Sequence, residues 1–244
     1  PLSVNDHGVT RMTRSILAIL VTFPLAMPAS AQDCSTDGGV GAGSNAYADM
    51  VAQGESAGDW RAANPLSTAT GRYQFMYGTL EDFGYIDGRD PGVSMESLYG
   101  EGDWEGVNWS GKNGINSRED FLSSPEAQNA LLAEFTESQM SAINVEEGRI
   151  VNGVPITPGG AAYAAHFLGA GASNSWASCG YQASCLPENI IAQNGDLASI
   201  NAMLTERLAT GAGVDPSCID SSGAGAGSGN AIPVSLMPWD AQGS

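Results

Sequence analysis

One carboxylic acid and a short polar loop are the residues of this chain best suited to catalysis. Glu55 ends an apolar run that includes Tyr47 and Val51, and residues 71–75 (GRYQF) begin sixteen residues later. A general acid must keep its proton near neutral pH, and burial in an apolar cleft raises the pKa of a carboxylic acid because it disfavours the anion. We therefore expect Glu55 to act as a general acid. The aromatic side chains expected to wall its cleft are Trp60, Tyr73 and Tyr77.

The elements that must position these residues are mainly helices. Residues 46–55 fit a helix capped by Ser44 or Asn45, with Met50 and Val51 toward the core and Glu55 near its end. Cap residues, first-turn prolines and apolar spacing predict further helices. These cover residues 78–84, a start at 117–120, residues 125–143 after the cap Ser124, residues 160–168 after a start at Thr157-Pro158 and stopped by Gly169, and a last helix capped by Asp196 with Leu197, Ile200, Leu204 and Leu208 on one face.

Two segments do not fit helices. Residues 150–156 predict a small β-hairpin around Asn152-Gly153. Residues 87–116 predict a long loop or extended flap, and long loops inside a domain are often functional. Trp104 and Trp109 lie in this loop, either as platforms for a sugar ring or as core anchors.

The chain divides into four parts. Residues 1–31 hold an upstream piece and a signal segment, 32–44 a glycine-rich linker, 45–209 the folded domain, and 210–244 a Gly/Ser-rich flexible tail. The apolar end of the tail is either disordered or a docking peptide for a partner such as an envelope secretion complex.

The beginning of the chain has the pattern of an export signal. Arg14 supplies the positive charge, residues 16–27 are apolar, and Ala29-Ser30-Ala31 forms a cleavage site. The apolar run is well short of the roughly 20 residues that span a bilayer. We expect cleavage after Ala31, no membrane span in the mature chain, and a periplasmic or secreted location; a retained anchor is the alternative.

The four cysteines agree with export. An even number in an exported chain favours disulfides. Proximity favours a Cys179–Cys185 pair, which leaves Cys34 and Cys218 to tie the two ends of the domain. We expect no metal and no cofactor, because the spacing lacks C-x-x-C and the chain has only two histidines.

The charge balance excludes one class of partner. The chain carries 27 acidic and 9 basic residues, a net charge of −18. Nucleic-acid binding needs a basic surface, so we expect none. An anionic glycan would not be attracted over long range either, and its binding would have to rest on short-range contacts.

Three segments, in order, resemble the lysozyme-like lytic transglycosylases, which cleave the glycan strands of bacterial cell wall. Residues 55–58 (ESAG) resemble the family's Glu-Ser-Gly-Gly opening. Residues 71–75 are similar to its Gly-Leu-Met-Gln-Ile loop, in the Tyr-Gln-Phe variant of phage-type and secretion-associated relatives. Residues 165–172 (AHFLGAGA) are similar to its Ala-Tyr-Asn-Ala-Gly-x-Gly segment. The resemblance covers roughly residues 46–172.

The resemblance implies a lysozyme-like single domain in which Glu55 is the catalytic acid. It also implies that Ser56 orients the acid or the nearby backbone, and that Gln74, with Tyr73 beside it, lies against the sugar. The family has a tyrosine opposite the acid where this chain has His166. Either His166 or Tyr163 would then face Glu55; the alternative for His166 is a hydrogen-bonded place in the core.

The number of carboxylates bears on the mechanism. Retaining and inverting glycosidases need a second carboxylate near the first, and Asp82, Asp87 and Asp90 are candidates, or else solvated surface charges. The family manages with one acid and leaves a 1,6-anhydro end. We predict cleavage of the β-1,4 bond between N-acetylmuramic acid and N-acetylglucosamine in peptidoglycan by this mechanism. The alternatives are a hydrolytic muramidase, a secreted toxin and a non-catalytic peptidoglycan-binding scaffold of an envelope machine.

Overall fold

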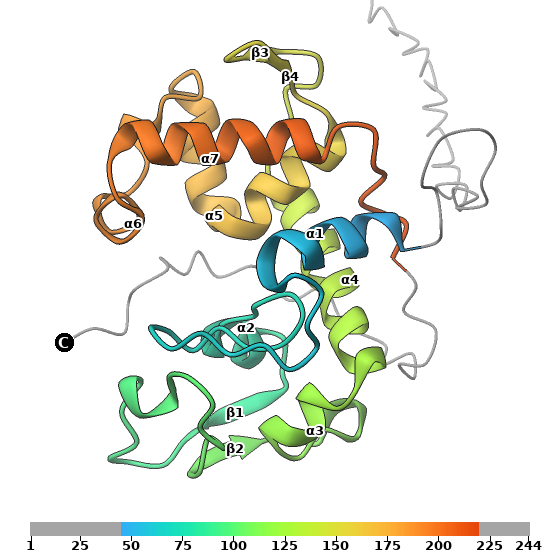
Figure 1. Ribbon diagram of the computed structural model, residues 1–244, viewed down its shortest axis with the longest axis vertical. Helices are drawn as coiled ribbons and strands as arrows, with labels where there is room; N and C mark the ends of the chain where they lie inside the picture. The colour runs from blue at the N-terminus through green and yellow to red at the C-terminus, as the bar shows by residue number, and fades with distance from the viewer. Residues whose placement is uncertain (1–44, 220–244) are drawn as a thin grey trace, which may run out of the picture. The chain divides into compact units, whose positions relative to one another are not determined.

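Most of the chain that the computed structural model describes, residues 45–219, is helical, as predicted (Figure 1). The helices are α1 Ala46–Ser56, α2 Tyr77–Asp82, α3 Arg118–Leu122, α4 Pro125–Ala142, α5 Pro158–Ser178, α6 Glu188–Asn194 and α7 Leu197–Thr210, with three 3-10 turns, η1 Glu96–Leu98, η2 Lys112–Gly114 and η3 Ala183–Cys185. The predicted signal segment, linker and Cys34, and the tail beyond residue 219, lie outside the described residues.

Side-chain caps begin α3, α4, α5 and α7, and those of the last three were predicted and are confirmed, whereas the side-chain cap expected from Asn45 at α1 is not formed. Ser124 accepts the Ala127 N–H at 3.1 Å, Thr157 accepts the Gly160 N–H at 3.1 Å, and Asp196 accepts the Ser199 N–H at 2.8 Å. Each satisfies a backbone donor that has no partner inside its helix. Within residues 45–219, no helix is long and apolar enough to cross a membrane.

Two small antiparallel strand pairs complete the fold. Strand β3 (Ile150–Val151) pairs with β4 (Val154–Pro155), which confirms the predicted hairpin. Strand β1 (Ile86–Arg89) pairs with β2 (Val107–Trp109) inside the segment that was predicted to be a loop. These two strands were not predicted, because strands this short show no run of alternating apolar residues.

The helix predictions need three corrections. Gly169 leaves the helical conformation (φ 70°, ψ 163°), yet α5 resumes and runs on to Ser178 because its later residues, among them Trp176, are buried. Helix α6 was not predicted. Leu197, expected on the buried face of α7, is 43% exposed at its first turn.

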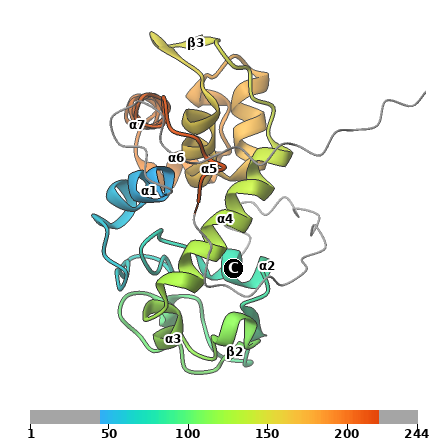
Figure 2. The ribbon, with the colours of Figure 1, turned by 90° about the vertical axis from the view of Figure 1, so that its right-hand side faces the viewer.

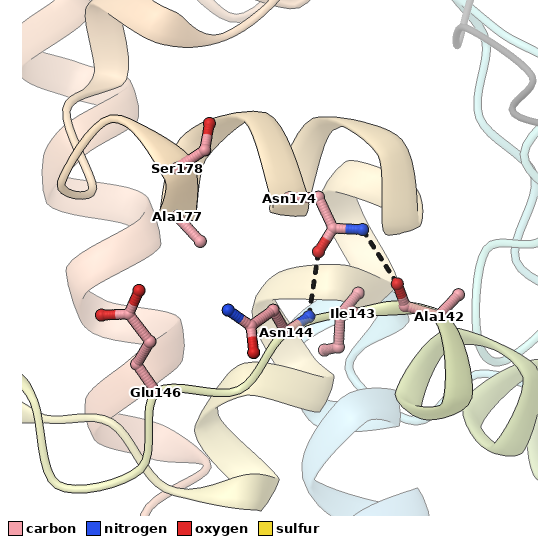
Figure 3. Close-up of a pocket in the computed structure, with 7 residues that line it drawn as sticks. All are labelled: Ala142, Ile143, Asn144, Glu146, Asn174, Ala177 and Ser178. Carbon is pink, nitrogen blue, oxygen red and sulfur yellow. Dashed lines mark hydrogen bonds between the residues drawn. The ribbon is translucent and has the colours of Figure 1, made fainter.

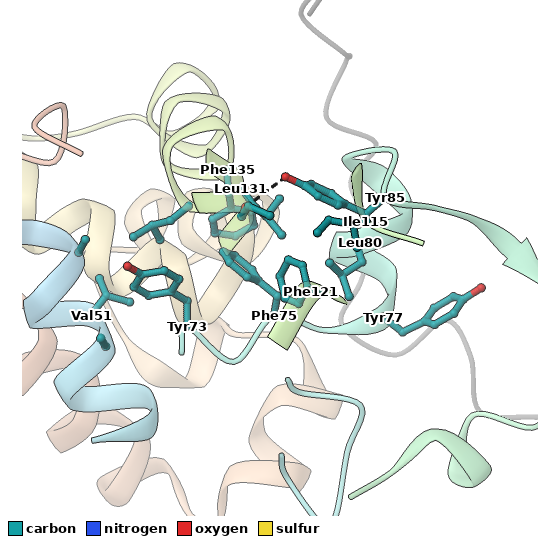
Figure 4. Packing of buried hydrophobic residues seen from close by; sticks show 14 of the residues in the cluster. Val51, Tyr73, Phe75, Tyr77, Leu80, Tyr85, Ile115, Phe121, Leu131 and Phe135 are labelled. Atoms are coloured by element: carbon teal, nitrogen blue, oxygen red, sulfur yellow. Dashed lines mark hydrogen bonds between the residues drawn. The ribbon is translucent and has the colours of Figure 1, made fainter. Parts of the chain in front are cut away.

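The buried side chains form two clusters. The first joins α1, α2, α4 and the segment around Phe75, where aromatic rings of Tyr73, Phe75 and Phe135 meet (Figure 4). The second joins α5, α6 and α7 around Trp176 and Leu204. Helix α5 supplies residues to both clusters, and both ribbon views show α1 beside α7 (Figures 1 and 2).

The end of the described chain is packed and cross-linked. The predicted Cys179–Cys185 disulfide is present. The predicted pairing of Cys218 with Cys34 stays a prediction, because Cys34 is not among the described residues. Beyond α7, Val214 and Ile219 pack against the first cluster, so packed structure extends past residue 209.

Candidate active site

Glu55 lies in the last turn of α1, and packing on the other side of that helix sets its direction. Tyr47, Ala48, Val51 and Ala52 are buried. Ala57 then takes a left-handed conformation (φ 54°) and ends the helix. The Glu55 side chain is 16% exposed, so the carboxylate is mostly enclosed but still reaches solvent.

The loop formed by residues 71–75 is held against the end of α1. The Ser56 hydroxyl donates a hydrogen bond to the Arg72 carbonyl at 2.7 Å. Thr70 and Phe75 exchange two backbone hydrogen bonds of 3.0 Å each, which closes the loop at its base. The Gln128 side chain accepts the Arg72 N–H at 2.7 Å from α4. Ser56 therefore joins the candidate acid to the loop.

Gln74 and Tyr73 differ in what they can reach. The Gln74 amide donates to the Gly71 carbonyl at 3.0 Å and is half-buried, with a left-handed backbone (φ 53°). Tyr73 is fully buried, its hydroxyl donates to Asn129 at 2.6 Å, and burial raises its pKa to about 12. We therefore assign Tyr73 a packing role and leave it out of the residues proposed to touch a sugar.

A sequence signal for the burial of Tyr73 was present. In the sequence, the aromatic residues Tyr73, Phe75 and Tyr77 stand at alternate positions, and in the structure all three are buried while the positions between them are half-buried (Figure 4). Alternation of this kind is typical of extended chain, where successive side chains face opposite ways. The polar positions Arg72 and Gln74 occupy the other face.

His166 connects α5 to the same loop. Its Nε2 lies 3.0 Å from the Tyr73 carbonyl, and its ring packs against Phe75 and Phe135. Burial lowers the pKa of His166, which favours the neutral ring. The Tyr73 carbonyl can only accept, so Nε2 carries the hydrogen and Nδ1 is left as a buried acceptor without a partner. His166 thus has a hydrogen-bonded place in the core.

Tyr163 and Arg207 are the side chains that close around Glu55. Arg207, on α7, places Nη1 2.6 Å from Glu55 Oε1. Its guanidinium lies over the Tyr163 ring at 4.4 Å and the Phe167 ring at 5.0 Å. Burial raises the pKa of Tyr163; the Arg207 charge lowers it and the Glu55 charge raises it. Of the two candidates to face the acid, Tyr163 is the one whose ring lies against Arg207, but the Glu55 charge acts on His166 as well and raises its pKa against the lowering by burial.

Arg207 was not among the residues predicted from the sequence. It sits next to Leu208 at the edge of the apolar stripe of α7, and it is the one basic residue of that helix. Basic residues are rare in this acidic chain. A single one next to the buried face of a helix therefore predicts an ion pair inside the protein.

The tryptophans and the other carboxylates lie differently. Trp104 is buried, stacks on Trp109 with centroids 6.0 Å apart, and donates to the Leu98 carbonyl at 2.8 Å, which favours its interpretation as a core anchor. Asp87 and Asp90 are exposed, as solvated charges are. Asp82 is half-buried at the end of α2, and burial raises its pKa. Within residues 45–219, no group of His, Cys, Asp and Glu forms a metal site.

A hollow of about 420 Å³ lies elsewhere, between the end of α4 and the second half of α5 (Figure 3). Asn174 accepts the Asn144 N–H at 2.9 Å and donates to the Ala142 carbonyl at 2.8 Å, so its amide is already engaged. Glu146, on the rim, is paired with Arg149. The hollow therefore presents no free charged group for catalysis.

The contact between Gly54 and Tyr163 gives a test of the site's packing. A methyl group on Gly54 would lie 1.8 Å from the Tyr163 hydroxyl oxygen and 3.1 Å from the ring carbon that carries it. Gly54→Ala should therefore lower the free energy of unfolding by about 1–2 kcal/mol, despite the better helix propensity of alanine. Tyr163→Phe in the same chain should recover most of the loss. Urea unfolding of the single and double variants measures this, and equal stability of Gly54→Ala and wild type would contradict the contact.

Comparison with known proteins adds no relative. No protein-family model matches the chain, and neither a curated protein nor a solved structure matches it.

Proposed function

We propose that this protein is an exported peptidoglycan lytic transglycosylase that cleaves the β-1,4 bond between N-acetylmuramic acid and N-acetylglucosamine, with Glu55 as its single acid. The observation that carries the proposal is the meeting of the three segments that resemble the family. The Ser56 hydroxyl is hydrogen-bonded to the Arg72 carbonyl of the loop. The His166 ring is hydrogen-bonded to the Tyr73 carbonyl of the same loop, although the two residues are 93 positions apart in the sequence. The disulfide agrees with an oxidising compartment outside the cytoplasm.

The chemistry assigned to Glu55 has two steps. Glu55 first donates its proton to the glycosidic oxygen, and the bond between that oxygen and C1 of the muramyl residue breaks. The carboxylate then takes the proton of the muramyl 6-hydroxyl, whose oxygen forms a new bond to C1. The products are a strand with a free 4-hydroxyl and a strand with a 1,6-anhydro end, and Glu55 has regained its proton.

Product analysis tests the proposal. Residues 32–244, purified and incubated with peptidoglycan sacculi, should release muropeptides that are lighter by one water molecule than the hydrolysis products. Mass spectrometry of the released fragments measures this. Fragments with ordinary reducing ends would assign a hydrolytic muramidase instead, and an absence of released fragments would overturn the proposal.

A second candidate is the peptidoglycan-binding scaffold, and one observation favours it. Glu55 is ion-paired with Arg207, a contact that a binding scaffold could use for structure alone, whereas the first step of cleavage needs Glu55 as the carboxylic acid. Such a scaffold would sediment with sacculi and release no glycan fragments. Equal amounts of wild type and Glu55→Gln would sediment.

A further inference from the structure

We infer that Arg207 is a positioning residue for Glu55, and that it stabilises the negative charge that Glu55 acquires as it gives up its proton. The inference rests on the proposed function. It concerns a side chain on α7, which lies beyond the segments that resemble the family.

The ion pair between Arg207 and Glu55 is more enclosed than the other ion pairs of the described chain. The Arg207 side chain is 11% exposed and that of Glu55 16%. In the other four pairs of residues 45–219 the acid is between 34% and 66% exposed. Exposed ion pairs contribute little because water and salt screen them, and enclosed pairs are screened much less. The charge of Arg207 therefore acts on Glu55 more strongly than a surface arginine would.

The guanidinium is held in one place by its surroundings. It lies over the rings of both Tyr163 and Phe167, at 4.4 Å and 5.0 Å from their centroids, and such faces attract a cation. Its Nε is buried without a hydrogen-bond partner. Glu55 is thus the acceptor that orients this arginine, and the rings keep the arginine from swinging away.

The geometry also divides the two oxygens of the carboxylate. Arg207 Nη1 bonds Oε1 at 2.6 Å, which leaves Oε2 as the oxygen available to carry and return the proton. As the proton leaves Oε2, negative charge spreads over both oxygens, and a fixed donor at Oε1 stabilises that charge in the transition state. Removing one such fixed donor from an active site typically costs about 10²–10³ in kcat.

The test compares variants of Arg207 on sacculi or on isolated glycan strands. Arg207→Met keeps the length of the side chain but loses its charge, and we expect kcat to fall by about 10²-fold with KM changed less than about threefold. Arg207→Lys keeps a cation within reach and should recover about tenfold of that loss. Guanidinium chloride at low millimolar concentration should partly restore Arg207→Ala.

Arg149→Met is the matched control. Arg149 also pairs with a carboxylate, Glu146, and lies 5.0 Å from an aromatic ring, that of Tyr181. It contacts none of the residues around Glu55 described above, so its loss should leave kcat and KM unchanged. If removing any arginine that stacks on an aromatic ring lowered activity, kcat would fall equally in Arg149→Met and Arg207→Met.

The outcomes separate the inference from the proposed function. One outcome would contradict only the inference about Arg207: an active wild type, an inactive Glu55→Gln, and an Arg207→Met that keeps the full kcat. A higher kcat for Arg207→Met would also overturn it, because Arg207 would then restrain the acid. If wild type releases nothing, both fall. If Arg207→Met folds poorly, the ion pair can be tested by a double-mutant cycle. We would compare the shifts in Tm of Glu55→Gln, of Arg207→Lys and of the double variant. Additive shifts would contradict an ion pair between the two residues.

Discussion

Glu55→Gln should reduce the release of glycan fragments by about 10³-fold or more while the protein stays folded. Glutamine has nearly the volume of glutamate but no proton to transfer, and general acid catalysis contributes about 10²–10⁴ in rate. The amide oxygen can still accept the hydrogen bond from Arg207 that Glu55 Oε1 now accepts at 2.6 Å. We therefore expect a loss of only about 1 kcal/mol in the free energy of unfolding. Fragment release and urea unfolding, measured on the same preparation, check both parts.

Glu206→Gln is the control for this prediction. Glu206 is the residue before Arg207, is exposed, and lies near enough to act electrostatically on Tyr163. Its substitution removes one carboxylate from the neighbourhood without touching the acid, and activity should stay within about twofold of wild type. If Glu206→Gln were inactive and Glu55→Gln active, the assignment of the acid would be wrong.

The helices could be predicted because their signals act within one turn. Ser124, Thr157 and Asp196 cap helices through hydrogen bonds to an N–H three residues later, so a few consecutive residues suffice to place each start. The hairpin at Asn152-Gly153 and the Cys179–Cys185 disulfide are equally local.

The partners of Glu55 could not be predicted in the same way. Arg207 is 152 positions away in the sequence, and the contact depends on how α7 packs beside α1 and α5. Local spacing carries no information on that packing. The pairing of β1 with β2 was missed for a similar reason: its register includes an irregularity between Ile86 and Gly88, and the strands are too short to show a pattern.

The site also divides residues that look equivalent in sequence. Tyr73 and Gln74 are neighbours in one loop, yet Tyr73 is fully buried and Gln74 is half-buried. His166 has the position the resemblance assigns to a tyrosine, but its ring packs between Phe75 and Phe135. Glu55 and Tyr163, with Arg207, are therefore the residues we would substitute first, and His166 and Tyr73 are residues whose loss should act through stability.

Gly211→Ala should lower the free energy of unfolding by about 2–3 kcal/mol, the range for forcing extra atoms into a packed site. Gly211 follows α7 where the start of α5 passes closest. A methyl group on Gly211 would lie 2.5 Å from the Gly159 carbonyl oxygen and 2.7 Å from the Gly160 α-carbon. These are backbone atoms, so the two helices must move apart for the methyl group to fit. Arg207 lies one turn before Gly211, and we expect activity to fall as well because the guanidinium moves with α7.

Gly78→Ala is the matched control for Gly211→Ala. Gly78 lies inside α2, and a methyl group there would meet no atom within 4 Å. Alanine is the better helix former, so this substitution should raise the free energy of unfolding by about 0.5–1 kcal/mol. Urea unfolding at a single temperature compares both variants with wild type. If both glycines tolerated alanine equally, α5 and α7 would not approach each other as closely as the contact between Gly211 and Gly159 requires. The packing that holds Arg207 beside Glu55 would then be in question.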